Sequence, residues 1–487
     1  MKIRCLDNKT NQQIDVIIAT VPWTDSSIPL MAPAALKPIV EKSGHSCLAV
    51  DLNAEIFDIT SKFPDLDDYL AFFFDGVCKT PSSQAWISDM LLSVSQHMLS
   101  WNSKFIGLSV FSYACRSTTK WLCYFLKKSN PNVKIILGGA GCLEQFTGPS
   151  DYAQELIADG LADYYVRGDG EQSLYQLLTG NVSYHGINDI SWKQLDNEEI
   201  AMLPMPDYSD YDFSIYKKLI LPLQGSRGCV RQCTFCDYIA NWTMFRWRPA
   251  DHVFNEMKEQ YQRYGIRTFK FQDTLTNGNI KEFNKLIELL ARHNSTHPKQ
   301  SFRWGGYYIF REKTASDDHT WSLLKQSGAD LLIVGIENLN EDIRFAIGKK
   351  FSNASIDYHL GKALQHNIRL QFLFIVGYVS ETQEHIDFAK QWLHSHTEYQ
   401  PVLESLQWGG TLGIFPNTWL DRNKEQLPIK ILGPKPHMWS NPQTGNNQAT
   451  RARWVNELNQ LSKDLGYTVS DFVDNHFLLE QMINVVE

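Results

Sequence analysis

The 487-residue sequence contains no run of 18 consecutive apolar residues, so it predicts no transmembrane helix. Its N-terminus also lacks an early apolar run, because Asp7 and Asn8 precede the first one, and this excludes a secretory signal of the usual form. A chain with neither segment is expected in the cytoplasm, where free thiols persist and no membrane is bound.

The sequence also has few cysteines and no excess of basic over acidic residues. Nine cysteines in 487 residues are too few for a disulfide scaffold. There are 46 Lys and Arg against 54 Asp and Glu, a formal charge of −8, which argues against a protein that coats extended nucleic acid. With 43% apolar and 21% charged residues the chain is an ordinary globular protein, and its length gives a prior of about three domains.

Short apolar runs alternate with helical patterns over the first 180 residues. Four runs lack polar alternation, as strands buried on both faces do: 15–21, 47–51, 105–110 and 133–137. Helical patterns lie between them at 31–42, 84–98 and 118–128. This order predicts a doubly wound, Rossmann-like parallel sheet over residues 1–195, and such α/β sheets bind ligands at the carboxyl ends of their strands.

A second series of strands and helices begins after the proline-rich joint at 202–207. Its strand candidates are 219–224, 268–272, 302–308, 331–335, 369–376 and 406–414. Its helix candidates are 252–264, 280–293, 317–327, 356–366 and 382–396. Six repeats instead of eight predict a partial (β/α)6 barrel over residues 196–415, with reactive groups at the carboxyl ends of its strands.

The last part of the chain, residues 416–487, breaks this rhythm. A stretch rich in Pro, Asn and Gly is followed by helical patterns at 449–465 and 469–485. We expect a small, mostly helical region that caps the barrel or faces the substrate.

Three of the nine cysteines cluster after the first strand of the second series. Cys229, Cys233 and Cys236 have the spacing Cys-x3-Cys-x2-Cys. Three thiolates this close can ligate three irons of a 4Fe–4S cluster and leave the fourth iron open. An open iron can chelate S-adenosylmethionine, and one electron then cleaves the sulfonium to methionine and a 5′-deoxyadenosyl radical. This radical can remove a hydrogen atom from an unactivated C–H bond.

A structural zinc site is the alternative use of the three thiols. Such a site needs a fourth ligand, and the nearest histidine, His252, lies 16 residues beyond Cys236. A second cysteine pair at ribbon-like spacing is absent from the sequence. A non-catalytic zinc-binding interaction module is therefore the rival hypothesis from another class.

The segment SRGCVRQCTFC, residues 226–236, resembles the cluster loop of radical S-adenosylmethionine enzymes. Together with the preceding βα domain, it makes residues 10–415 similar to the subclass that contains a cobalamin-binding domain. The resemblance implies that Cys229, Cys233 and Cys236 ligate the cluster and that Phe235 packs near the adenine of S-adenosylmethionine. It also implies a small-molecule or peptide substrate and an electron donor such as flavodoxin or ferredoxin.

A second similarity lies at the end of the second barrel strand. Residues 271–276 resemble the family segment in which two adjacent acidic residues help hold the methionine amino group. Here Gln272 and Asp273 occupy these places, and Gln272 brings an acceptor but no charge. The alternative for Asp273 is a turn or cap residue ahead of the helix that begins near Ile280.

Two further strand ends resemble the family. Residues 334–338 resemble a Gly-x-Glu-Ser segment, which implies that Glu337 hydrogen-bonds the ribose or a substrate. An N-cap interaction with the helix after Asn340 is the alternative role of Glu337. At the end of the fifth strand, the resemblance implies that backbone groups at Ile375 and Gly377 bond the adenine.

The resemblance of the first domain implies that cobalamin lies over the carboxyl edge of its sheet. Ser109 ends the third strand, and Gly138 and Gly139 end the fourth, where missing side chains would admit the nucleotide tail. Residues 165–171 resemble a recurrent segment at the last strand of such domains. The Asp-x-His-x-x-Gly motif that places histidine on cobalt is absent, as it is from many radical methylases.

The reaction that this resemblance implies is cobalamin-dependent methylation of an unactivated carbon. Rearrangement, cyclisation or other C–H chemistry without methyl transfer is the alternative within the same class. Cys115, Cys123 and Cys142 could indicate the second cluster of methylthiotransferases, but their wide spacing favours buried packing.

Large aromatic residues lie near several predicted strand ends. Trp242, Trp247 and Trp304 could line a substrate pocket, but we expect them to pack between the barrel and its helices. The catalytic side chains and the identity of the substrate are left open by the sequence.

Overall fold

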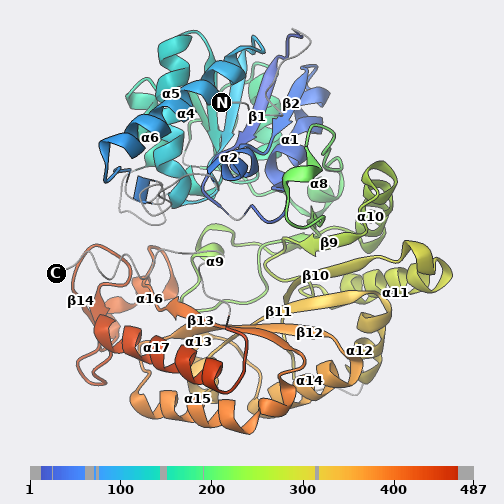
Figure 1. Ribbon diagram of the computed structural model, residues 1–487, viewed down its shortest axis with the longest axis vertical. Coiled ribbons are helices and arrows are strands. Elements are labelled where there is room, and N and C mark those ends of the chain that lie inside the picture. Colours follow the sequence, from blue (N-terminus) through green and yellow to red (C-terminus); the bar gives the residue numbers. More distant parts are fainter. Residues whose placement is uncertain are drawn as a thin grey trace. The chain divides into compact units, whose positions relative to one another are not determined.

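The computed structural model describes residues 12–24, 26–60, 71–72, 76–142, 151–189, 191–312 and 317–469. The chain forms two compact units, Met1–Leu219 and Ile220–Glu487, and each unit is built on its own parallel sheet (Figure 1). The predicted α/β fold class is therefore confirmed. Within the described ranges, no helix combines the length and apolarity needed to cross a membrane.

The first unit contains a five-stranded parallel sheet in the order β2-β1-β3-β4-β5. Its strands are β1 (Val16–Thr20), β2 (Cys47–Val50), β3 (Phe105–Ser109), β4 (Lys134–Gly138) and β5 (Tyr164–Val166). The order changes direction between β1 and β3, which is the switch point of a doubly wound sheet. The predicted Rossmann-like architecture is confirmed, and four strands coincide with the apolar runs of the sequence.

Helices cover both faces of this sheet. Val16 and Ile18 point to the face covered by α1 (Met31–Lys42) and α7 (Gly170–Leu178). Ile17 and Ala19 point to the opposite face, which packs against α4 (Pro81–Leu99) and α5 (Arg116–Ser129). Burial on both faces explains why these strands lack polar alternation. Further helices in the described part of the unit are α2 (Leu52–Thr60), α6 (Tyr152–Ala158) and α8 (Asn197–Ala201).

The division between the two units differs from the predicted boundary at 195/196, because residues 196–219 belong to the first unit. Polar side chains hold this segment there. Asp210 accepts a hydrogen bond from Lys37 at 2.7 Å, and the hydroxyl of Tyr216 donates to the buried Asp51 at 2.9 Å. Contacts between single side-chain pairs produce no hydrophobic period in the sequence. From the sequence alone, the proline-rich segment at 202–207 is therefore interpreted as a joint between domains.

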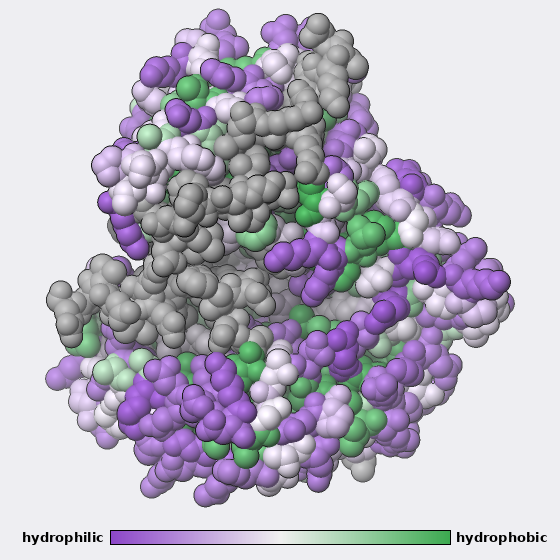
Figure 2. Space-filling model, in the orientation of Figure 1, coloured by the Kyte–Doolittle hydropathy of each residue, from purple (hydrophilic) through white to green (hydrophobic). Residues whose placement is uncertain are grey.

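The second unit contains six parallel strands whose order follows the chain, from β6 at one edge to β13 at the other. They are β6 (Leu221–Leu223), β9 (Thr268–Phe271), β10 (Arg303–Tyr308), β11 (Ala329–Glu337), β12 (Arg369–Val376) and β13 (Leu403–Thr411). The helices that connect them are α10 (Ala250–Tyr264), α11 (Ile280–Thr296), α12 (Asp317–Gln326), α14 (Asn353–His366) and α15 (Gln383–Ser395). This is the predicted partial (β/α)6 barrel. The outer surface around α14 and α15, low in the view, is mainly hydrophilic (Figure 2).

Aromatic side chains identify the helix-covered face of the barrel sheet. Trp304 of β10 lies edge-on to Phe271 of β9 and to Phe283 of α11, with ring centroids 5.6 and 6.1 Å apart. Because side chains alternate along a strand, Lys270 and Tyr307 project from the opposite, concave face. Substrates of a βα barrel approach from this face and from the carboxyl ends of the strands.

Several short elements were not predicted. They are α9 (Asp237–Asn241), α13 (Glu341–Ile347), α16 (Trp419–Arg422) and the antiparallel pairs β7 (Ser226–Arg227) with β8 (Arg246–Trp247) and β14 (Lys430–Ile431) with β15 (Trp439–Ser440). Elements this short contain too few residues to show a hydrophobic period. The helix predicted at 449–465 is α17 (Gln448–Asp464), and the one predicted at 469–485 lies almost wholly outside the described residues.

The two edges of the barrel sheet are protected from further strand pairing in different ways. At one edge, the short strand β6 contains Pro222, which has no backbone N–H to offer. At the other edge, the backbone N–H of Leu406 in β13 donates to the carbonyl of Thr468 at 2.9 Å, and Leu406 forms a parallel bridge with Val469. The chain therefore returns to cover part of β13 after α17.

Candidate cluster and cofactor site

The three clustered cysteines lie in the loop that follows β7 and leads into α9. Cys233 is buried, Cys229 and Cys236 are partly exposed, and all three are free thiols. The loop begins at Gly228, which has a φ of +84° and whose Cβ, if present, would lie 2.1 Å from the carbonyl oxygen of Met244. Only glycine fits this turn, so the sequence forces the cysteines to follow a tight bend against the next strand.

The environment of Cys233 and Cys236 disfavours their ionisation in the absence of a cation. Burial raises the pKa of Cys233 to about 12 and that of Cys236 to about 11, and the neighbouring thiols add to the shift. Iron would reverse this effect, because a coordinating thiol is deprotonated by the metal. The backbone N–H of Arg231 also donates to the sulfur of Cys229, at 3.4 Å.

Among the residues that the structure describes, no three His, Cys, Asp or Glu side chains converge on a point where one metal ion could sit. A 4Fe–4S cluster takes one thiolate per iron, so its ligands do not have to converge on one ion. His252, the predicted zinc alternative, is an exposed residue in the first turn of α10.

The cysteine loop is anchored to two other strand ends. The backbone N–H of Thr234 donates to the carbonyl of Ile347 at 2.9 Å, and its hydroxyl lies 2.9 Å from that of Tyr378. Cys233 packs in an apolar cluster with Ile347 and Tyr378, and Phe235 and Ile375 pack against the same cluster. Cys236 packs against this cluster too, so the structure brings together two predicted iron ligands and two residues predicted to contact adenine.

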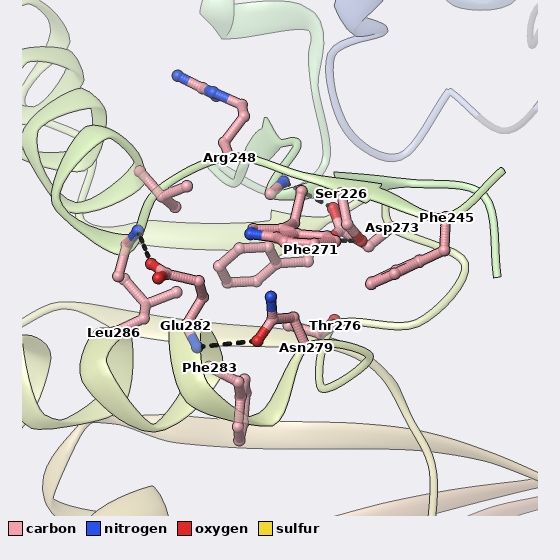
Figure 3. Close-up of a pocket in the computed structure, with 14 residues that line it drawn as sticks. Ser226, Phe245, Arg248, Phe271, Asp273, Thr276, Asn279, Glu282, Phe283 and Leu286 are labelled. Atoms are coloured by element: carbon pink, nitrogen blue, oxygen red, sulfur yellow. Dashed lines mark hydrogen bonds between the residues drawn. The ribbon is translucent and has the colours of Figure 1, made fainter. Parts of the chain in front are cut away.

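Asp273 holds the start of this loop. Its carboxylate accepts hydrogen bonds from the backbone N–H of Gly225 at 2.8 Å and from the hydroxyl of Ser226 at 2.6 Å (Figure 3). Burial raises the pKa of Asp273 to about 7, against the lowering effect of these donors. Asn279 caps α11, so the cap alternative for Asp273 is wrong. Gln272 is exposed beside it.

A small cavity of about 30 Å³ adjoins this carboxylate and extends toward α10 and α11 (Figure 3). Phe245, Phe271 and Phe283 supply most of its apolar wall. This space has room for a water molecule beside the Asp273 carboxylate.

Glu337 lies at the carboxyl end of β11 with a φ of +64°. It forms an ion pair of 3.0 Å with Lys349, and both side chains are largely buried. Burial alone would lower the pKa of Lys349, but Glu337 and the nearby thiol of Cys233 raise it. Asn340 caps α13 with its own side chain, so the cap alternative for Glu337 is wrong as well. The Glu337–Lys349 ion pair therefore places a positively charged side chain near Cys233, a predicted iron ligand.

The turn after β12 is built around Glu381. Gly377 has a φ of +88°, and its backbone N–H donates to the Glu381 carboxylate, as does that of Tyr378. Asn338, at the end of β11, donates to the other oxygen of Glu381. Burial raises the pKa of Glu381 to about 7. The N–H of Gly377 is therefore engaged by the protein, and Ile375 is paired with Gly410 of β13.

The C-terminal region clamps this turn, a feature that the sequence did not reveal. Arg451 of α17 packs against Gly377, where an added Cβ would lie 2.2 Å from the arginine Cδ. Its guanidinium lies over the ring of Trp439, 4.0 Å from the centroid, and donates to the side chain of Asn446. Asn446 in turn donates to the carbonyl of Tyr378 at 2.9 Å. The region therefore supports the barrel strand end directly.

In the first unit, the predicted cobalamin residues lie at the carboxyl edge of the sheet. Ser109 of β3 is paired in register with Gly138 of β4, next to the switch point. Among the described residues, the nearest atom to a Cβ on Gly138 would be the carbonyl oxygen of Val166 at 3.8 Å, so this part of the chain leaves the position open. A Cβ on Gly139 would lie 2.5 Å from the carbonyl of Val110, and φ there is +99°. Glycine at 139 is therefore required by the chain itself, whether or not a ligand binds.

The other cysteines and tryptophans behave as packing residues. Cys115, Cys123 and Cys142 are buried in the apolar core of the first unit. Trp304 is also buried and donates to Ser327 at 3.1 Å. The remaining two predicted tryptophans stack on neighbouring aromatic rings, Trp242 on Tyr238 and Trp247 on Phe245.

Comparison with known proteins places this geometry in a family. Residues 223–393, from the first barrel strand to α15, match the model of the Radical SAM superfamily. The second unit therefore carries a radical SAM domain, the class that uses S-adenosylmethionine and a 4Fe–4S cluster, and the predicted membership of this class of enzymes is confirmed.

Curated proteins with similar sequences include two bacterial enzymes. The chain is 24% identical over 282 residues to the anaerobic magnesium-protoporphyrin IX monomethyl ester cyclase of Synechocystis sp., covering 54% of this chain and 53% of that protein. It is 28% identical over 197 residues to the bacteriochlorophyllide d C-12(1)-methyltransferase of Chlorobaculum tepidum, covering 37% and 40%. The chain spans about half or less of the length of these relatives.

Two solved structures share the fold over most of the chain. The radical S-adenosylmethionine methyltransferase TsrM from Kitasatospora setae, with cobalamin and a 4Fe–4S cluster bound, aligns with a TM-score of 0.63 at 14% identity over 88% of this chain and 79% of its own. The cobalamin-dependent radical enzyme OxsB, with aqua-cobalamin and S-adenosylmethionine bound, aligns with a TM-score of 0.61 at 14% identity over 92% and 66%. These alignments establish the shared fold.

Proposed function

We propose that this chain binds a 4Fe–4S cluster through Cys229, Cys233 and Cys236 and uses S-adenosylmethionine and cobalamin to methylate an unactivated carbon. The observation that carries the proposal is the loop of three free thiols at the carboxyl end of β6, inside the segment that matches the Radical SAM superfamily. The Rossmann-like first unit, with its open strand edge at Gly138, supports the cobalamin part.

The residues around the loop have the chemistry to hold S-adenosylmethionine. When bound, the cluster would supply the electron that cleaves the sulfonium and yields the 5′-deoxyadenosyl radical. Phe235 and Ile375, which share the apolar cluster of Cys233, would enclose the adenine. Glu337 would accept from the ribose, and Gln272, exposed beside the anchored Asp273, would accept from the methionyl amine.

The first unit would hold cobalamin at the switch point of its sheet. When bound, cobalamin would supply the methyl carrier of the reaction. Ser109 would donate or accept at this edge, and Gly138 would let the ligand approach the backbone of β4. Gly139 would fix the direction in which the chain leaves the strand.

Anaerobic reconstitution with iron and sulfide tests the enzyme. The wild type should become brown, contain about four irons per chain, and convert S-adenosylmethionine to 5′-deoxyadenosine when reduced. Replacing all three loop cysteines by serine should abolish both properties, whereas Cys78→Ser, at a partly exposed thiol of the first unit, should change neither. Equal behaviour of the wild type and the triple variant, or zinc without iron and sulfide, would contradict the proposal.

A reaction without methyl transfer is the second candidate, because one of the similar curated proteins is a cyclase. Two measurements separate the candidates. If the enzyme is a methyltransferase, methyl-labelled S-adenosylmethionine should pass its label to the product. If the reaction involves no methyl transfer, the label should be found only in methionine. Corrin absorbance in protein purified with added cobalamin should appear in the first case.

A further inference from the structure

Two arginine side chains that are not part of the proposed ligand set lie close together in the second unit. Arg231 belongs to the cysteine loop, between Cys229 and Cys233, and Arg311 follows β10. In the sheet, β6 and β10 lie on either side of β9, so the loops that follow them leave the same edge of the sheet with one strand between them. The two charges act on each other: after burial, Arg231 is the largest influence that lowers the pKa of Arg311.

Neither guanidinium has a counter-ion among the described residues. The Nε–H groups of Arg231 and Arg311 are both buried and have no hydrogen-bond acceptor in that part of the chain. Arg311 is held from one side only, where its terminal nitrogen donates to the carbonyl of Asn277 at 2.9 Å. Its backbone carbonyl lies 2.8 Å from Nε2 of His359, which fixes the main chain at this point.

This arrangement is unfavourable unless something else binds there. Like charges repel, and a buried donor without an acceptor loses the hydrogen bond that it had to water. A pair of guanidinium groups with free Nε–H donors is the arrangement that binds carboxylate and phosphate, because the planar fork offers parallel donors to two oxygens. The site therefore has the charge and the donors for a small anion.

We propose that Arg231 and Arg311 form a binding site for an anionic group, a carboxylate or a phosphate, of the substrate. This inference rests on the proposed function, because it assigns the site to the substrate of the radical reaction. Arg231 shares its loop with the three cysteines, so an anion held there keeps the substrate beside the cluster. The carboxylate of S-adenosylmethionine has the same chemistry, and the experiment separates the two sources.

Titration calorimetry of the full-length, cluster-free chain with inorganic phosphate and with acetate tests the site. We expect one saturable anion site on the wild type and on the control Arg292→Gln, an exposed arginine of α11. Arg231→Gln and Arg311→Met should each weaken anion binding by roughly tenfold or more, as expected when a charge-assisted pair of donors is lost. Arg311→Lys should bind with intermediate affinity, because lysine keeps the charge without the fork.

The absence of anion binding by the wild type, or equal binding by all variants, would overturn the inference. Arg231→Gln changes a loop residue, so it keeps the test valid if Arg311→Met does not fold. Equilibrium dialysis of the reconstituted chain with S-adenosylmethionine provides the second arm. Unchanged affinity in the arginine variants supports a substrate site, whereas a tenfold loss that exceeds their loss of phosphate binding would assign the pair to S-adenosylmethionine and overturn the inference.

The outcome is separable from that of the proposed function. A wild type that binds phosphate at this site but does not cleave S-adenosylmethionine would overturn the proposed enzyme and leave the anion site in place without its assigned substrate. A wild type that cleaves S-adenosylmethionine but binds neither anion would overturn this inference alone.

Discussion

Asp273 accepts a hydrogen bond from the hydroxyl of Ser226 at 2.6 Å, which joins the end of β9 to the start of the cysteine loop. Its second oxygen accepts from the backbone of Gly225. Both oxygens of this carboxylate are therefore engaged by the protein before any cofactor binds. A residue that the sequence suggested as a ligand of methionine thus has a role in shaping the loop that carries the three thiols.

Asp273→Ala should destabilise the chain and impair loading of the cluster. It leaves the partly buried N–H of Gly225 without this acceptor, at about 1–3 kcal/mol, and leaves the Ser226 hydroxyl only its longer bond of 3.3 Å to the carbonyl of Leu275. Asp273→Asn keeps an acceptor and should cost less. Urea unfolding and iron content after reconstitution measure the two effects. A fully stable Asp273→Ala variant with the iron content of the wild type would show that the loop holds its shape by other contacts.

The cysteines should differ sharply in their reactivity toward iodoacetamide in the apo protein. Cys229 and Cys236 are partly exposed, whereas Cys115, Cys123 and Cys142 are buried, and burial raises the pKa of each of the three. Mass spectrometry should find the fastest labelling at Cys229, slower labelling at Cys236, whose pKa burial raises to about 11, and the slowest labelling of the core thiols. Reconstitution should protect the loop cysteines and leave the rates of the core cysteines unchanged. Protection of the core set instead would place the cluster in the first unit.

The stability that protonated Glu381 contributes to the fold should be lost as pH rises from 4.5 to about 7. Burial raises the pKa of Glu381 from 4.5 to about 7, so in this window the folded chain retains a proton that the unfolded chain releases. Each such group lowers the free energy of unfolding by up to about 1.4 kcal/mol per pH unit. Glu381→Gln removes one titrating group, and the slope in denaturant unfolding should become shallower. Asp273 contributes in the same direction, so part of the slope remains. An unchanged slope would exclude Glu381 as its source.

Arg451→Met should loosen the turn that follows β12. The arginine donates to Asn446 and to the carbonyls of His437 and Trp439, and its removal takes a donor from the buried Asn446 and Trp439 acceptors, at about 1–3 kcal/mol each. We expect a lower melting temperature and weaker binding of S-adenosylmethionine, with normal iron content. Arg453→Gln, an exposed position on the same helix, is the control. Reduced iron content with unchanged cofactor affinity would contradict this role.

The sequence predicted the two sheets because their strands are apolar on both faces or alternate with long helices. The predicted runs coincide with β1 to β4 and with all six barrel strands to within a few residues. The sequence pattern could not predict that segment 196–219 belongs to the first unit, because contacts such as that of Asp210 with Lys37 depend on a single side-chain pair. Short elements such as α13 were not predicted because they contain too few residues to show a hydrophobic period.

At the site, the cysteine spacing was sufficient to locate the loop, but the partners of the loop were not visible. Lys349 follows a short helix that has no sequence signal, and it becomes a neighbour of Cys233 only through the fold. Arg451 is likewise one of several basic residues in a helical pattern until the chain places it against Gly377. Contacts of this kind arise from tertiary packing, which local patterns do not encode.

The two edges of the open barrel also bear on self-association. A sheet that does not close leaves rows of unpaired N–H and C=O groups, which can template strand pairing between copies. Pro222 removes a donor at the β6 edge, and the bond from Leu406 to Thr468 occupies part of the β13 edge. The segment after α17 therefore covers part of an edge that would otherwise be open to strand pairing between copies, and this protection is independent of any cofactor.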